Sequence, residues 1–382
     1  MTGEIKKRLD AVDRATLTPL VRRILENENA KVMNWRYQPV EGGFGHAYGV
    51  YRFQGEAQAE DETLDWSLIL KVTGPATGSQ EPAAWNYWKR EVLVYQSGLL
   101  NDLPGDLVAP RCIGVVEYPG QEFWQWLEDV VESEKVWSLE RYGLAARHLG
   151  QFNGAYLVGK PIPKVPWLST GQLRQRLAMA EPGIAELPQL SQHPLFEGLL
   201  PDDSLERSLT LWTERQRFLA LLDRLPRSLC HHDAFRRNLI ARNGRDGRTQ
   251  TVAIDWTEMG TGGLGEEIAS FFHGLRFVAI DIDRIADLDA LIFAGYVDGL
   301  RDAGWQGDSR LARFGYAATA ALSSIADKAI KWPRIARRAA ALPAGAEPPR
   351  LLNPGGPAQA VAEQLYLLSL GEEACALLDT LG

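Results

Sequence analysis

The texture of the sequence changes near residue 135, and this change limits the possible fold more than any other feature. Before it, short runs rich in β-branched and aromatic residues alternate with turn residues, as in "WSLILKV" over 66–72. After it, apolar residues recur mostly at helical spacing. Besides a charged helix at the start, one main helix is expected in the first part, within 81–100, where Trp88, Val92 and Tyr95 share a face. The sequence therefore predicts an α+β chain with a small β-rich unit and a larger helical unit.

We place the boundary between the two units at residue 130. Residues 1–130 are expected to form an N-terminal lobe with a charged first helix, an antiparallel sheet and one main helix. Residues 131–382 are expected to form a mainly helical C-terminal lobe, with a Pro/Gly-rich linker over 341–357 before the last helix. A chain of 382 residues is long enough for two such units, and a cleft between them is the default ligand site.

Composition and charge exclude several classes of protein. No run approaches the roughly 18 apolar residues of a membrane span, and the charged start "MTGEIKKRLD" lacks the apolar core of a secretion signal. The formal net charge of −8 disfavours nucleic-acid binding. Cys112, Cys230 and Cys375 are too far apart for a disulfide framework or a zinc pattern. We therefore expect a cytoplasmic protein that binds neither nucleic acid nor membranes.

Two strand-like runs in the helical part, "NLIAR" and "TVAIDW", flank a short turn and carry polar residues at their ends. Asp233 and Asn238 precede the first strand, and Asp255 ends the second. A hairpin would bring Asn238 and Asp255 side by side. Phosphoryl transfer needs such a set, with one carboxylate for the acceptor hydroxyl and an amide oxygen and a second carboxylate for Mg²⁺. We therefore predict Asp233 as the catalytic residue and Asn238 and Asp255 as metal ligands.

These residues carry a resemblance to a known family. "HHDAFRRN" fits the H-x-D-x-x-x-x-N catalytic loop of the protein-kinase-like superfamily, and "AIDW" is similar to the metal-binding segment of its aminoglycoside phosphotransferase and choline kinase branch. Four further motifs resemble the phosphate loop, the strand lysine, the lobe connection and a helix of that branch: "VEGGFGHAYGV", "LILKV", "FWQWLEDVV" and "LGQFNGAYL". The motifs occur in the family's order over about 38–272. The resemblance implies a two-lobe protein-kinase-like fold.

The resemblance also implies a nucleotide site in the first lobe, made by Gly42, Gly43, Gly45, His46, Lys71, Glu91, Glu128 and Val130. Lys71 is expected to reach the phosphates, held by Glu91, while the loop of Gly42 to His46 binds the triphosphate. Backbone groups near Glu128 to Val130 are expected to bind adenine. Two alternatives remain open at this point. In the first, Lys71 is an edge-strand residue that faces solvent. In the second, Glu91 forms a surface ion pair with a neighbour such as Lys89 or Arg90.

Other residues of the catalytic segment are harder to assign. His231 is either a metal ligand, a proton carrier or, as its equivalent in the family implies, a structural brace of the loop. Glu267 stands where the family usually has Asp and is also interpreted as a brace. His232 occupies a position that usually holds glycine in this branch. The roles of His232, Arg236 and Arg237 stay open.

The resemblance implies an ATP- and Mg²⁺-dependent small-molecule kinase that phosphorylates a hydroxyl group. The stretch "DWTEMGTGGLGEEIASFF" lacks the D-F-G and A-P-E motifs of protein kinases, so a small acceptor is favoured over a peptide. Cationic antibiotics of the aminoglycoside or cyclic peptide type and amino alcohols are among the family's acceptors. Candidates for a cation site are Glu258, Glu266, Asp281 and Asp283, of which Asp281 and Asp283 are better interpreted as part of a solvated helix face. The motifs do not separate ATP from GTP, or a monomer from a homodimer.

Two other classes are weighed beside the kinase. A non-catalytic nucleotide-binding module is disfavoured because Lys71, Asp233, Asn238 and Asp255 are all present. A binder of nucleic acid or anionic membranes would use the basic "KAIKWPRIARR" over 328–338. Pro333 interrupts this segment and the whole chain is acidic, which argues against that use.

Overall fold

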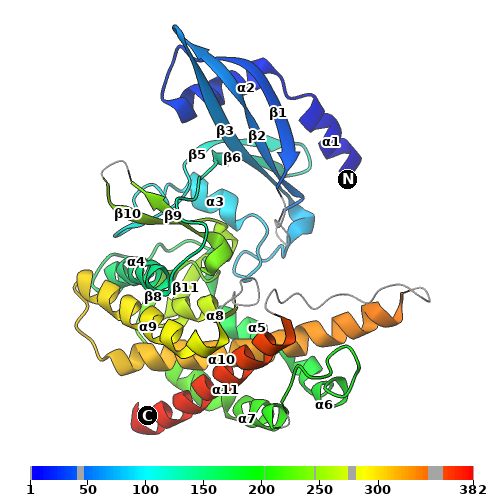
Figure 1. The fold of residues 1–382 in the computed structure, drawn as a ribbon, viewed down its shortest axis with the longest axis vertical. Helices are drawn as coiled ribbons and strands as arrows, with labels where there is room; N and C mark the ends of the chain where they lie inside the picture. The colour runs from blue at the N-terminus through cyan, green and yellow to red at the C-terminus, as the bar shows by residue number, and fades with distance from the viewer. Residues whose placement is uncertain are drawn as a thin grey trace.

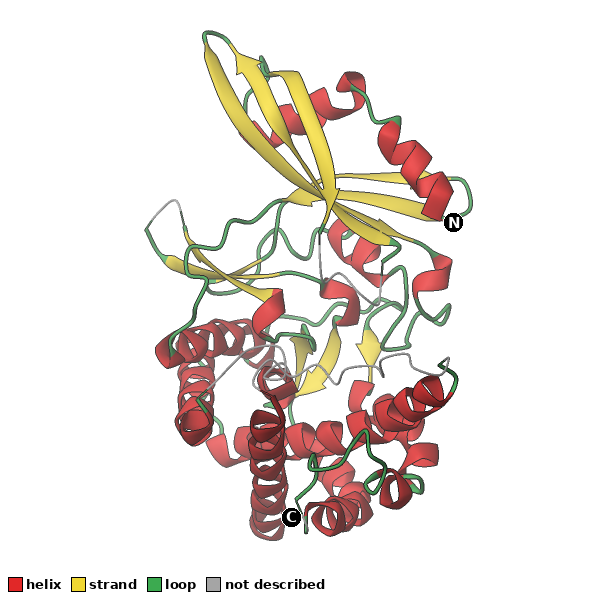
Figure 2. Cartoon of the chain, turned by 45° about the vertical axis from the view of Figure 1, so that its right-hand side comes forward, coloured by secondary structure: helices red, strands yellow, loops and turns green. Residues whose placement is uncertain are grey.

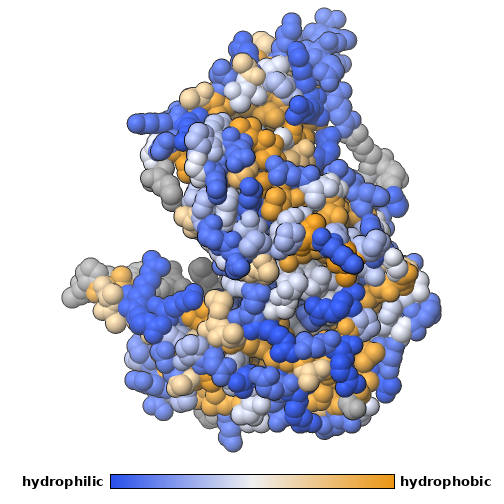
Figure 3. Space-filling view, turned by 180° about the vertical axis from the view of Figure 1, so that it is seen from behind, coloured by the Kyte–Doolittle hydropathy of each residue, from blue (hydrophilic) through white to orange (hydrophobic). Residues whose placement is uncertain are grey.

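The computed structural model of the protein describes residues 2–40, 47–201, 203–244, 247–273, 281–342 and 356–381. Figure 1 shows two parts, a twisted sheet with two helices at the top and a larger group of helices at the bottom. The α+β fold with a β-rich first part and a helical second part, predicted from the change in texture, is confirmed. Seen from behind, the surface is hollowed between the two parts (Figure 3).

The first part is built on a five-stranded sheet with the order β1-β2-β3-β6-β5, in which every neighbouring pair is antiparallel. Its strands are β1 (Lys31–Pro39), β2 (Gly49–Ala59), β3 (Glu62–Thr73), β5 (Cys112–Tyr118) and β6 (Glu122–Glu128). In this register Lys71 of β3 lies opposite Gln125 of β6. Trp124 and Trp126 are buried in the core between the sheet and the N-terminal helices.

The helices of the first part are shorter than the sequence predicts. The single charged helix expected at the start is two helices, α1 (Thr2–Asp10) and α2 (Arg14–Leu25). They separate at Asp13, whose side chain caps α2 by accepting the Thr16 N–H. The helix expected within 81–100 is α3 (Arg90–Gln96), and the residues before it form turns.

Two small sheets lie between the large sheet and the helices (Figure 2). One has the order β4-β10-β9 and contains the predicted hairpin of β9 (Leu239–Asn243) and β10 (Thr249–Ala253), with β4 (Leu107–Val108) at its edge. The other has the order β7-β11-β8, made by β7 (Ser169–Thr170), β11 (Gly260–Gly263) and β8 (Arg227–Cys230). These sheets hold the loops that carry the predicted catalytic residues.

The second part is mainly helical. Its helices are α4 (Leu139–Leu157), α5 (Gln172–Ile184), α6 (Leu187–Leu190), α7 (Ser204–Leu222), α8 (Ser270–His273), α9 (Ile285–Asp302), α10 (Ser309–Ala340) and α11 (Gly356–Leu381). Helices α4 and α9 approach closely because glycines face the partner backbone. A Cβ atom at Gly150 would lie 2.2 Å from the Tyr296 carbonyl oxygen, and one at Gly299 would lie 1.9 Å from the Arg147 carbonyl oxygen.

The basic segment 328–338 is part of α10 and is used for packing. Trp332 is buried and stacks on Phe196 with ring centroids 4.3 Å apart. Lys331 pairs with Asp327 on the same helix. The aromatic side chain that an anionic membrane would need therefore faces the core. No helix within the described ranges is long and apolar enough to cross a membrane.

Candidate active site

A buried lysine joins the two parts of the molecule. The Lys71 ammonium of β3 lies 2.6 Å from Glu91 Oε2 of α3 and 2.7 Å from Asp255 Oδ1, which follows β10. Burial opposes the charge of Lys71, but the carboxylates of Asp255 and Glu91 outweigh it and raise the pKa of the lysine. Lys71 is thus neither an edge-strand residue in solvent nor without a carboxylate partner, and Glu91 faces inward.

Glu91 also contacts the backbone beside Asp255. Its Oε1 accepts the Trp256 N–H at 3.1 Å, so one glutamate holds both the lysine and the segment that carries the predicted metal ligand. Asp255 has left-handed backbone angles, with φ 62° and ψ 64°. A non-glycine residue rarely adopts this conformation, and such strain is concentrated at functional sites.

The loop predicted to be catalytic brings Asp233 and Asn238 into direct contact. Asn238 stands at the end of the 3₁₀ turn η2 (Arg236–Asn238), and its Nδ2 donates to Asp233 Oδ2 at 2.8 Å and to the Asp233 carbonyl at 3.0 Å. Since the amide nitrogen serves Asp233, Asn238 Oδ1 is the atom left to accept or to ligate. The Ile254 N–H donates to the Asn238 carbonyl at 2.9 Å, which fixes the hairpin beside Asp255.

His231 braces this loop. Its Nδ1 accepts the Asp233 N–H at 3.2 Å, so its Nε2 donates to the Ile254 carbonyl at 2.9 Å. Burial lowers the pKa of His231 to about 4, and the ring packs edge-on against Trp256 at 4.5 Å. Both ring nitrogens are occupied, which supports the structural interpretation over a metal ligand or a proton carrier.

Glu267 holds the loop from the other side. It stands in η4 (Glu266–Ala269) and accepts the His231 N–H at 2.7 Å and the His232 N–H at 3.0 Å. The backbone of His232 has a left-handed φ of 67°, which explains why glycine suits this position. The bracing role expected for Glu267 agrees with these contacts.

The carboxylate of Glu258 is buried and lies near Asp233. Burial, together with the nearby charges of Glu258 and Asp255, raises the pKa of Asp233 well above its usual range. Burial also raises the pKa of Glu258 to about 7, although Arg176 and a hydrogen bond from Gln172 oppose that shift. The sequence indicated Glu258 only as one of several acidic positions, because its burial in η3 (Trp256–Glu258) is not visible in a pattern.

Arg90 was missed as a structural residue. Its side chain is fully buried and donates to five backbone carbonyls, those of Pro82, Ala84, Trp85, Trp167 and Thr257. Burial lowers the pKa of Arg90 to about 10. These contacts tie the turns before α3 to the segment after Asp255, and they explain why Arg90 does not pair with Glu91 at the surface.

The two residues predicted to contact adenine, Glu128 and Val130, differ in their surroundings in the connection between the lobes. The Glu128 N–H already donates to the Arg111 carbonyl at 2.9 Å, whereas Val130 lies beyond the strand ladder. Asp129 between them accepts two hydrogen bonds from Arg52 at 2.6 and 3.0 Å and one from Ser67. Gly42, Gly43, Gly45 and His46 lie outside the described residues.

The remaining acidic candidates differ in their surroundings. Glu266 lies 3.5 Å from Arg227, while Asp281 and Asp283 are exposed. No group of three or more His, Cys, Asp or Glu residues capable of holding a metal occurs in the described part of the chain. Asn238 Oδ1 and the Asp255 carboxylate fit Mg²⁺ as hard oxygen ligands, which usually share that ion with phosphates.

Comparison with known proteins shows where this arrangement belongs. The model of the phosphotransferase enzyme family, APH, matches residues 163–322, the range that contains the catalytic loop and Asp255. Residues 163–322 are therefore similar to this family. The resemblance to the aminoglycoside phosphotransferase and choline kinase branch is thereby confirmed. No curated protein matches the chain in sequence.

Solved structures of this phosphotransferase fold agree over most of the length. The amicoumacin kinase hAmiN, in complex with AMP-PNP, Ca²⁺ and Ami, is 13% identical, with a TM-score of 0.50 over 100% of this chain and 96% of that one. A choline kinase from Cryptosporidium parvum Iowa II is 11% identical, with a TM-score of 0.53 over 90% of this chain and 92% of that one. The kinase fold and the family match support a small-molecule kinase that acts on hydroxyl groups.

Proposed function

We propose that this phosphotransferase moves the γ-phosphate of ATP to a hydroxyl group of a small molecule, with Asp233 as the catalytic residue. The observation that carries the proposal is the cluster at the lobe junction. Lys71 contacts both Glu91 and Asp255 there, and the hairpin brings Asp233 and Asn238 next to Asp255. A structural ion pair alone does not require the strained backbone of Asp255 or the braced loop before Asp233.

Asp233 receives the acceptor hydroxyl in this proposal. The acceptor oxygen forms a bond to the γ-phosphorus, the bond from that phosphorus to the β–γ bridging oxygen breaks, and the hydroxyl proton passes to Asp233. The raised pKa of Asp233 suits a group that must accept a proton at neutral pH. Asn238 holds the Asp233 carboxylate through a 2.8 Å hydrogen bond, so this carboxylate meets the acceptor in a single orientation.

The nucleotide is assigned to the first lobe. Lys71, oriented by Glu91, binds the phosphates, the loop of Gly42 to His46 covers them, and backbone groups of Glu128 to Val130 bind adenine. When bound, Mg²⁺ neutralises charge on the phosphates, held by Asn238 Oδ1 and Asp255. We also propose residues 1–130 and 131–382 as the two domains.

The acceptor is proposed to carry an amino group near the reacting hydroxyl, as in amino alcohols or cationic antibiotics. Asp233, Asp255 and Glu258 act on one another as like charges, and Arg176 offsets only part of that charge for Glu258. An ammonium group near these carboxylates reduces their repulsion.

The test is a screen of hydroxylated amines with Mg-ATP, run on the wild type and on Asp233→Asn. We expect Asp233→Asn to lower the transfer rate by roughly 10²–10⁴-fold with nearly unchanged nucleotide affinity. EDTA should stop transfer, and added Mg²⁺ should restore it. Loss of ATP affinity in Asp233→Asn, with normal transfer at saturation, would mean that the roles of Asp233 and Asp255 are exchanged.

A further inference from the structure

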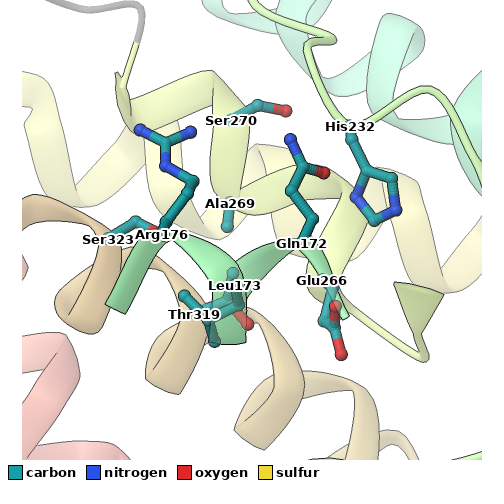
Figure 4. A pocket seen from close by; sticks show the side chains of 9 residues that line it. All are labelled: Gln172, Leu173, Arg176, His232, Glu266, Ala269, Ser270, Thr319 and Ser323. Atoms are coloured by element: carbon teal, nitrogen blue, oxygen red, sulfur yellow. The ribbon is translucent and has the colours of Figure 1, made fainter. Parts of the chain in front are cut away.

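A hollow that is open to solvent, with about 30 Å³ of enclosed space, lies in the helical lobe behind the predicted catalytic loop (Figure 4). Helix α5 contributes Gln172 and Arg176 to its wall, η4 and α8 contribute Glu266 and Ser270, and α10 contributes Thr319. His232, the residue directly before Asp233, closes one side. Gln172 also donates to Glu258, and the Arg176 charge acts on Asp233, so the hollow adjoins the carboxylates proposed to meet the acceptor.

Three polar atoms of this lining have no hydrogen-bond partner among the residues that the structure describes. They are Gln172 Oε1, His232 Nε2 and Thr319 Oγ1. Gln172 and Thr319 are only 6% and 8% exposed, so bulk water does not serve their side chains freely. Buried polar groups are nearly always paired in folded proteins, and three such atoms around one hollow indicate a ligand with matching groups.

The hydrogen-bonding character of these atoms defines the ligand. Gln172 Oε1 accepts only, since the amide nitrogen donates to Glu258. His232 makes its ring hydrogen bond with the Thr261 backbone, and burial lowers its pKa to about 3, so the imidazole is uncharged. The Thr319 hydroxyl both donates and accepts. The set suits O–H and N–H groups.

The charged groups of the lining already have partners. Arg176 lies 2.6 Å from Asp327, and Glu266 lies 3.5 Å from Arg227. An ammonium group in this hollow would meet the Arg176 guanidinium, while the Glu266 carboxylate is already engaged with Arg227. A carboxylate would face Glu266 and the acceptor atoms of Gln172 and His232. Both charges are therefore disfavoured.

We propose that the hollow is a subsite for an uncharged hydroxyl- or amide-bearing part of the acceptor, bound by Gln172, His232 and Thr319. This assignment rests on the proposed function, and it adds a neutral polar group to the amine expected near Glu258. In this assignment Gln172 and Thr319 determine specificity, because they bind the acceptor in the hollow and do not touch its reacting hydroxyl.

Crystals soaked separately in acetamide, glycerol and methylammonium chloride test the subsite directly. We expect acetamide or glycerol to place one polar group in the hollow, hydrogen-bonded to Gln172 Oε1 or Thr319 Oγ1, and no methylammonium there. Absence of both neutral probes from the hollow, or binding of methylammonium in their place, would overturn the proposal. These soaks contain no nucleotide, so their result does not depend on phosphate transfer.

Variants of Thr319 provide the solution test, with binding of the soaked neutral probe followed by NMR titration. Thr319→Val keeps the shape but removes the hydroxyl, and we expect about threefold to tenfold weaker binding of that probe. Thr319→Ser should restore the affinity, and Thr213→Val, the same change on the exposed face of α7, should not alter it. Equal affinity in all variants would contradict the subsite. Failure of the wild type to transfer phosphate, with the probes bound, would instead count against the proposed function.

Discussion

Lys71 is the residue on which the nucleotide assignment depends most, because it meets one carboxylate from each lobe. Lys71→Met should lower kcat/KM for ATP by about 10²-fold or more, since a cation aimed at the phosphates is removed. Glu91→Gln should lower it less, because Glu91 only orients the lysine. Steady-state kinetics with varied ATP measure both effects.

Lys89 offers a control for that experiment. It lies two residues before Glu91, and its ammonium lies 4.6 Å from the Phe123 ring centroid instead of at the cluster. Lys89→Met should leave kcat/KM near the wild-type value. A loss as large as that of Lys71→Met would show that general cationic charge, not the buried position, matters.

Glu258 should set the pH at which the enzyme becomes active. Burial and the charge of Glu258 raise the pKa of Asp233, so activity should be lost as pH falls through that raised pKa. Glu258→Gln removes a like charge and should move the acid limb of the kcat/KM profile to lower pH. Glu266→Gln, whose charge is not among the leading causes of the Asp233 shift, should leave the limb in place. If the acid limb does not move in Glu258→Gln, the charge of Glu258 does not raise the pKa of Asp233.

The residues that sequence reasoning found are those whose chemical type is unusual for their setting. A lysine within the apolar run "LILKV" and an asparagine five residues after Asp233 stand out in the sequence, and the structure brings them to one site. Arg90, by contrast, looks like any helix-surface arginine. Its role depends on backbone carbonyls from segments far apart in the chain, and no residue pattern reports where those carbonyls point.

Among the elements, the α4–α9 pair depends most on single glycines. Gly299→Ala would place a methyl group 1.9 Å from the Arg147 carbonyl oxygen, a distance that forces the helices apart. We expect a loss of about 1–3 kcal/mol in the free energy of unfolding, as for overpacked cores. Urea unfolding gives the value. Gly3→Ala, which meets no atom within 4 Å, is the matched helical control and should not destabilise.

Element boundaries were predicted well where periodicity reflects burial and poorly where it does not. The acidic run "QGEAQAEDETLD" between two strand-like runs predicts an exposed hairpin connection. It is strand on both sides of a turn at Glu60 and Asp61, because β2 and β3 pair along their whole length as one hairpin, and Ala57 and Ala59 are buried in the core. Backbone pairing with a neighbouring strand, not side-chain polarity, decides this segment.

At the scale of the whole molecule, buried histidines link stability to acidity. His148 bonds Thr251 at 2.8 Å, and burial lowers its pKa to about 4 from an ordinary 6.5. Between these pH values the unfolded chain binds a proton that the folded chain does not. Stability is therefore lost as pH falls, by on the order of 3 kcal/mol at pH 4.

The variant His148→Gln isolates this contribution. Its unfolding free energy should lie below the wild-type value at pH 7, and the gap should narrow as pH falls toward 4.5. Urea unfolding of both proteins at several pH values measures the gap. A gap that stays constant with pH would contradict the assignment of a neutral buried histidine.

The two-lobe layout was predictable because strand and helix periodicities occupy separate parts of the chain. Of the small sheets between the lobes, the sequence predicts the hairpin of β9 and β10 but not strand β11. β9 and β10 have apolar residues and a turn, whereas β11 is "GTGG", and a Cβ at Gly260 would lie 2.0 Å from Ser169 Oγ. Glycine strands of this kind are defined by the close approach of their neighbours, which sequence pattern does not encode.

The contact between Lys71 and Asp255 has a consequence for the order in which ligands arrive. The ammonium occupies the same carboxylate that is proposed to hold Mg²⁺, so Lys71 competes with a free divalent ion for Asp255. Phosphate oxygens give the lysine another partner and release that carboxylate. Metal and nucleotide are then thermodynamically linked, each tightening the other, and Lys71→Met should uncouple them by allowing Asp255 to bind the ion without nucleotide.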